Sequence, residues 1–94
     1  MPQYQVLYWR DIPTQIKVRG DGARLSAQLP ESFQTFIDRI AMREGLTGTD
    51  AYLDQWQWTP RREREGDAVE VLQALEAELT AEGQRVIARY KAEA

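Results

Sequence analysis

The sequence predicts an α+β fold: a small three-stranded, mainly antiparallel sheet with two helices on one face, in the order strand, strand, helix, strand, helix. Three observations support this fold class. Polar and apolar residues alternate near the start of the chain and again around Trp56, as they do in strands. Two longer segments repeat their apolar residues at helical spacing, and glycine or proline separates most of these segments. The 94 residues are enough for one domain, 1–94, with a single core.

The first two strands form a predicted hairpin at the start of the chain. From Tyr4 to Trp9, both alternating faces carry aromatic or aliphatic groups, which is typical of a central strand that is at least partly covered on both sides. Pro13 has no N–H for a ladder and indicates the turn. The second strand covers Gln15 to Arg19, with its aliphatic residues pointing inward and its cations in water.

A turn and the first helix follow this hairpin. Gly20-Asp21-Gly22 predicts the turn, because glycine tolerates positive φ and aspartate bonds its own backbone. The next residues, Ala23 to Gln28, fit a short edge strand or an extended connector, and we favour the connector. The first helix runs from Pro30 to about Glu44, since proline suits a first helical turn, and Gly45 closes it.

The third predicted strand, from about Leu53 to Thr59, contains the most distinctive residues of the chain. Its alternation places Trp56 and Trp58 on one face. Tyr52 and Trp56 are also four residues apart, so one helical turn over the first part of this segment is an alternative.

A charged loop over residues 61–66 leads to the long second helix. Asp67 and Glu70 have the spacing of a capping box, which predicts the start of a helix that runs from Ala68 to about Lys91. Gly83 lies inside this helix at a cost of about 0.5–1 kcal/mol relative to alanine, which would allow a kink near this glycine.

The order of the segments limits the topology of the sheet. A right-handed crossover through the first helix makes the third strand parallel to the second, and a place beside the first strand completes a split β-α-β unit. With both helices on one face, the other face of the sheet stays open.

The composition argues against several classes of function. The chain has no cysteine and no histidine, so thiolate chemistry is excluded and the commonest general base and metal ligand are missing. The carboxylates match no known ligand spacing, and we therefore expect no enzyme, no metal and no cofactor. The net charge of -3 argues against nucleic acid as a partner. With no long apolar run and no visible signal peptide, we expect a soluble, cytoplasmic protein without a membrane partner.

The best candidate for a functional surface is a set of aromatic residues with arginines at its edge. On an open sheet face these side chains would bind a protein partner through apolar, ionic and cation–π contacts. The alternative is that individual tryptophans simply belong to the core. A platform for single-stranded RNA is a weaker alternative, because the glycine-aromatic consensus of such domains is missing. The predicted partner-binding residues are Trp9, Tyr52, Trp56, Trp58, Arg61, Arg62 and Arg64.

Three stretches of the chain carry a resemblance to a known family. They are Tyr4-Gln5-Val6-Leu7-Tyr8-Trp9-Arg10-Asp11-Ile12-Pro13, then Ser32-Phe33-Gln34 with Ile37-Asp38 and Ala41-Met42-Arg43, then Thr49-Asp50-Ala51-Tyr52-Leu53-Asp54-Gln55-Trp56. The chain resembles the virulence factor domain family, named after the C-terminal part of conserved virulence factor C proteins, up to about Gly66. The resemblance implies a module found elsewhere on helical-repeat scaffolds, with no activity or catalytic residue to transfer. It also implies an association with one-carbon and corrinoid methyl transfer.

These observations lead to a favoured functional hypothesis and two others. The favoured one is a non-catalytic protein-interaction module or accessory subunit, whose partner is another protein or a second copy of the chain in a homodimer. The alternative, which the resemblance suggests, is a small-ligand-binding or accessory subunit that supports folate or corrinoid methyl-transfer enzymes. A flat ring system would then stack on Trp56 or Trp58. An independent enzyme, the third, would need a buried carboxylate pair in a cleft.

Overall fold

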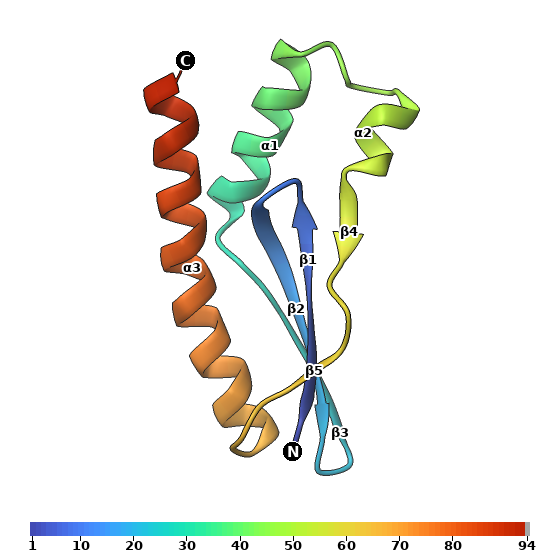
Figure 1. The fold of residues 1–94 in the computed structure, drawn as a ribbon, viewed down its shortest axis with the longest axis vertical. Helices are drawn as coiled ribbons and strands as arrows, with labels where there is room; N and C mark the ends of the chain where they lie inside the picture. Colours follow the sequence, from blue (N-terminus) through green and yellow to red (C-terminus); the bar gives the residue numbers. More distant parts are fainter. Residues whose placement is uncertain (94) are drawn as a thin grey trace.

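The structure, a computed structural model, describes residues 1–93 as an antiparallel sheet with helices packed against it (Figure 1). The strands are β1 (Gln3–Trp9), β2 (Ile12–Gly20), β3 (Ala23–Gln28), β4 (Trp56–Trp58) and β5 (Arg62–Glu63). The helices are α1 (Glu31–Arg43), α2 (Asp50–Asp54) and α3 (Ala68–Glu93). The α+β class is thus confirmed, but the sheet has five strands in this part of the chain rather than three.

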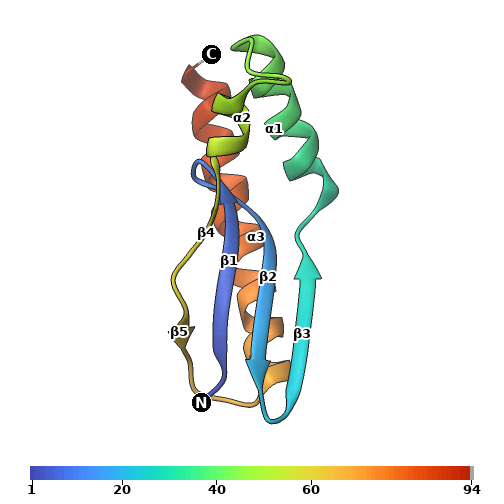
Figure 2. The ribbon, with the colours of Figure 1, turned by 90° about the vertical axis from the view of Figure 1, so that its right-hand side faces the viewer.

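The strands lie in the order β3-β2-β1-β4, and β5 also pairs with β1 (Figure 2). Strand β1 is central, as the hydrophobicity of both its faces predicts. Strand β4 lies beside β1 and antiparallel to it, so it runs parallel to β2. The predicted position and direction of the strand after the first helix are therefore confirmed.

Residues Ala23 to Gln28 form β3, and the prediction of a connector there is wrong. Asp21 and Gly22 both adopt positive φ, at 53° and 75°, and make a two-residue turn that sends the chain straight back along β2. The register then continues without a break from the Gly20–Ala23 pair to the Gln15–Gln28 pair. Because the tight turn places residues 23–28 alongside β2, they form a strand rather than a connector.

The predicted strand from Leu53 to Thr59 is wrong in its first half. The Thr49 side chain accepts a hydrogen bond from the Tyr52 N–H at 3.3 Å and caps the short helix α2, so the helical alternative holds there. Only Trp56–Trp58 form a strand. Residues 62–63 of the predicted charged loop pair with β1 as β5.

Both long helices begin and end within two residues of their predicted bounds. Gly45 follows α1 with a φ of 70°, as the predicted C-terminal stop requires. The Asp67 carboxylate accepts a hydrogen bond from the Glu70 N–H at 2.9 Å and caps α3. Helix α3 continues through Gly83 without interruption.

The sequence predicts that both long helices lie on one face of the sheet, and this prediction is wrong. Helix α3 lies along one face, whereas α1 packs at the upper end, against β2 and α3 (Figures 1 and 2). The core fills the space between these elements, and Ile16 and Ile37 are completely buried in it. At the crossing of the two helices, the Phe33 ring of α1 packs against Gly83 of α3. The face away from α3 stays open below α2 (Figure 2).

Tyr8 ties the sheet to α3, because its hydroxyl donates a hydrogen bond to Glu82 Oε2 at 3.1 Å. Burial, together with the nearby Glu82 carboxylate, raises the pKa of Tyr8 from its ordinary 10.0 to about 12.

This shift predicts a loss of stability at alkaline pH. The folded state favours the neutral phenol, so the stabilisation is fully present below pH 10 and is lost as the pH rises toward about 12. We expect the free energy of unfolding to fall less steeply over this range in Tyr8→Phe than in the wild type. Chemical denaturation followed by circular dichroism measures both slopes, and equal slopes would contradict the assignment.

Candidate functional site

The predicted aromatic set is divided between the core and the surface. Trp9 has no exposed surface, and its indole N–H donates a hydrogen bond to the Tyr52 carbonyl at 3.3 Å. The ring centroids of these two residues are 5.9 Å apart, and those of Tyr52 and Trp56 are 6.2 Å apart, edge to face. Helix α2 and strand β4 thus cover Trp9. The prediction that Trp9 lies on an exposed face is wrong, because these later segments pack over that end of β1.

Trp58 is the predicted aromatic residue that remains on the open face. Its side chain is 37% exposed, whereas Tyr52 and Trp56 are half-buried against the core. Trp58 lies opposite Leu7 in the register of β4 and β1. The Lys17 Nζ from β2 lies 4.2 Å from the centroid of its ring, in a cation–π contact.

The three predicted arginines lie in different environments. Arg64 points toward α3, where its Nη1 donates a hydrogen bond to Glu78 Oε1 at 3.0 Å, and this contact lowers the pKa of Glu78. Arg62 belongs to β5 and is paired with Tyr4 of β1. Arg61 lines a groove on the open face of the sheet. Only Arg61 therefore contributes to a surface that other basic residues share.

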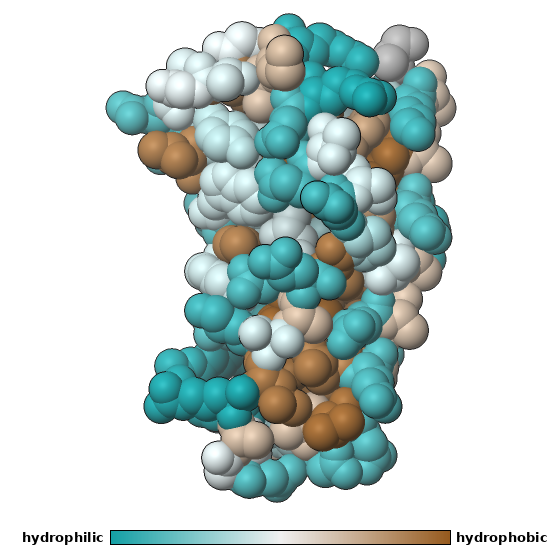
Figure 3. All heavy atoms as spheres, turned by 180° about the vertical axis from the view of Figure 1, so that it is seen from behind, coloured by the Kyte–Doolittle hydropathy of each residue, from teal (hydrophilic) through white to brown (hydrophobic). Residues whose placement is uncertain are grey.

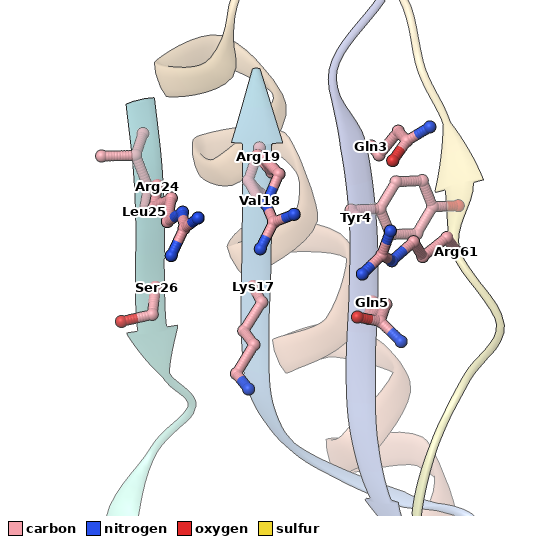
Figure 4. A pocket seen from close by; sticks show the side chains of 10 residues that line it. All are labelled: Gln3, Tyr4, Gln5, Lys17, Val18, Arg19, Arg24, Leu25, Ser26 and Arg61. Carbon is pink, nitrogen blue, oxygen red and sulfur yellow. The ribbon is translucent and has the colours of Figure 1, made fainter. Parts of the chain in front are cut away.

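This groove, which the sequence analysis missed, crosses the half of the sheet nearest the turn between β2 and β3, and Figure 4 shows it from close by. It has a volume of about 310 Å³. Two rows of side chains cross the strands on its floor, Gln3–Arg19–Arg24 and Gln5–Lys17–Ser26. Arg61 reaches in from the segment between β4 and β5, over β1. We call the surface formed by Lys17, Arg19, Arg24 and Arg61 the basic groove.

Electrostatics set the basic groove apart from the rest of the surface. It holds four of the twelve cations of the chain and none of its fifteen carboxylates. Three arginines outside the groove have a carboxylate within ion-pair distance: Arg10, for example, holds Glu44 through two hydrogen bonds of 2.8 and 2.7 Å and lowers its pKa. Within residues 1–93, no carboxylate lies within ion-pair distance of the groove cations. The groove is therefore suited to bind anionic groups.

Holding these cations together has an energetic cost. Arg19 and Arg24 lie directly opposite each other on neighbouring strands, and like charges in such a pair are destabilising. The pair contributes nothing to the core, since both side chains are exposed. An anionic partner would offset this repulsion.

A signal for the groove was present in the sequence. Lys17 and Arg19 alternate with the inward-pointing Ile16 and Val18, and Arg24 and Ser26 alternate with Leu25 and Ala27 in the same way. With residues 23–28 assigned as a strand rather than a connector, both rows would have appeared on one face.

Residues 1–93 contain no group of three or more aspartate or glutamate side chains arranged to hold a metal ion. None of the charged side chains in this range is buried. The helices of residues 1–93 also include none with the length and apolar character required to span a membrane.

Comparison with known proteins gives one match. A family model described as "Virulence factor" matches residues 7–89, which include Trp58, all four cations of the basic groove and most of α3. The comparisons with curated proteins and with solved structures found no match.

Proposed function

This chain belongs to the virulence factor family, and we propose that it is a non-catalytic interaction module or accessory subunit that binds a protein partner through the open face of its sheet. The observation that carries this proposal is the arrangement on that face, where a partly exposed tryptophan contacts Lys17, one of the four groove cations without a carboxylate partner. The partner would cover Trp58 and place acidic groups over the basic groove.

The composition of this face supports a role in protein binding. Tryptophan and arginine are enriched among the residues that dominate the energetics of protein interfaces. Trp58 supplies apolar area, and Arg19, Arg24 and Arg61 supply donors for charged hydrogen bonds. The cation–π contact with Lys17 also holds the Trp58 ring in place before a partner arrives, which lowers the entropic cost of binding.

The test is affinity capture from the natural source cells, with the wild-type chain compared with Trp58→Ala. We expect the variant to lose a specific partner, because truncation of a central tryptophan typically costs about 2 kcal/mol or more of binding free energy. Met42→Ala is the matched control, since Met42 is an apolar residue, 73% exposed, on α1. A partner captured equally by wild type and Trp58→Ala would contradict the proposal. Circular dichroism must first show that each variant is folded.

The identity of the captured partner also separates the two forms of this proposal. A folate- or corrinoid-dependent methyl-transfer enzyme would favour the accessory subunit that the family resemblance suggests. A volume of about 310 Å³ is at the lower end of small-ligand sites, so binding of an anionic small molecule in the basic groove fits that second form.

A further inference from the structure

Strand β3 is a free edge of the sheet. The strand order places β2 on one side of β3 and no strand of residues 1–93 on the other. Over its six residues β3 contains no proline, and its register with β2 has no bulge. Natural proteins usually protect such an edge with these devices or cover it. The one charged residue of β3 is Arg24, so this edge is suited to pair with a further strand whose side chains complement a cation.

The register shows which backbone groups of β3 face outward. A two-residue turn joins β2 to β3, so the flanking Gly20 and Ala23 form a hydrogen-bonded pair, and every second pair after it does the same. The hydrogen bond from the Leu29 N–H to the Thr14 carbonyl, at 2.9 Å, continues this alternation beyond β3. The N–H and C=O groups of Arg24, Ser26 and Gln28 therefore point away from β2.

The two sides of this edge differ in chemistry. The side chain of Arg24 lies on the open face, beside Arg19 in the basic groove (Figure 4). Leu25 points to the opposite side, where it is half-buried against the core. Figure 3, which looks onto the β3 side of the molecule, shows hydrophobic side chains gathered in the lower half with hydrophilic ones around them. A strand added here would meet cations on one face and apolar groups on the other.

We propose that β3 accepts an additional strand from the partner, an extended segment in which acidic residues alternate with apolar ones. This inference rests on the proposed function, since it specifies the partner's chemistry and how it binds. The acidic side chains would face Arg24 and Arg19, and the apolar ones would lie beside Leu25. Charge complementarity favours this occupant over a second copy of the chain, whose own β3 would bring another Arg24 to the same edge.

The first test measures binding of a fluorescent peptide, in which glutamate alternates with valine, to the full chain. We expect binding to protect the amide hydrogens of Arg24, Ser26 and Gln28 from exchange in NMR spectra. Ser26→Pro removes one outward N–H without breaking a bond to β2, and we expect roughly tenfold weaker binding by fluorescence anisotropy. Ser26→Ala is the matched control, because it keeps the N–H, and it should bind as the wild type does.

A second pair of variants tests the charge. The double variant Arg19→Gln, Arg24→Gln should bind the peptide roughly tenfold more weakly, and the salt dependence of binding should be smaller. Arg39→Gln with Arg85→Gln removes the same charge from exposed positions on α1 and α3, and should leave binding unchanged. A peptide with lysine in place of glutamate should not bind.

Several results would overturn this proposal. They are an unchanged affinity in Ser26→Pro, equal binding of the lysine peptide, or tighter binding of an oligonucleotide that carries the same charge. A dimer in light scattering with the β3 amides protected in the absence of peptide would assign the edge to a second copy. If the peptide does not bind but Trp58→Ala still loses the captured partner, the proposed function stands and only the β3 site is wrong.

Discussion

Replacement of Trp9 by alanine is expected to destabilise the protein by about 3–5 kcal/mol, the usual range for a fully buried tryptophan. The indole is completely buried, and its removal leaves a cavity between β1 and α2. The Tyr52 carbonyl also loses its hydrogen bond from the indole N–H. Small domains have total stabilities of about 5–15 kcal/mol, so a large share of the folded state would be lost. Urea denaturation followed by circular dichroism measures the change.

Trp58→Ala provides the control, because it removes the same side chain from the open face. We expect a cost of about 1 kcal/mol or less, mainly from the lost contact with Lys17. A larger destabilisation for Trp58→Ala than for Trp9→Ala would reverse the assignment of the two residues to surface and core. Trp9→Phe should fall between wild type and Trp9→Ala, since it keeps most of the apolar volume.

Gly83→Ala is expected to destabilise the protein by about 1–3 kcal/mol, although alanine is the better helix former. The reason is the crossing of α1 and α3. A Cβ atom at this position would lie 2.3 Å from Phe33 Cε2 and 2.6 Å from Cζ, so the ring or the helices would have to move. Glycine is therefore present to let the two helices approach, and thermal unfolding of the variant measures its contribution.

A second substitution tests this explanation. Phe33→Leu shortens the side chain, so the double variant Gly83→Ala, Phe33→Leu should be more stable than the sum of the two single effects predicts. Gln84→Ala, at the exposed neighbouring position of α3, should change the stability by less than about 0.5 kcal/mol. If Gly83→Ala stabilised the protein, helix propensity would be the dominant effect and the proposed clash would be wrong.

The elements with long, regular patterns were predictable from the sequence. Strands β1 and β2 alternate clearly, and α1 and α3 combine helical spacing with capping residues at their starts or ends. For β3 the edge strand was the less favoured of two predictions, because its inward residues, Leu25 and Ala27, give a weak hydrophobic signal over only six positions. The turn at Asp21 and Gly22 decides its structure by bringing it alongside β2.

The candidate site was predictable only in part, because local alternation does not reveal what packs above a sheet. Trp9 and Trp58 both belong to strands with aromatic alternation, and nothing in their neighbours distinguishes them. Their environments differ because α2 packs over Trp9, whereas β4 presents Trp58 beside Lys17. The basic groove required the pairing of β2 with β3, which brings Arg19 and Arg24 together from separate segments.

The two cross-strand rows on the open face have a consequence for how this domain evolves. A strand residue points to one face only, so the side chains of Lys17, Arg19 and Arg24 change without disturbing Ile16 or Val18 in the core. Under the proposed function, selection for folding acts on one set of positions and selection for partner choice on the other. The open face could then change its partner while the scaffold stays the same.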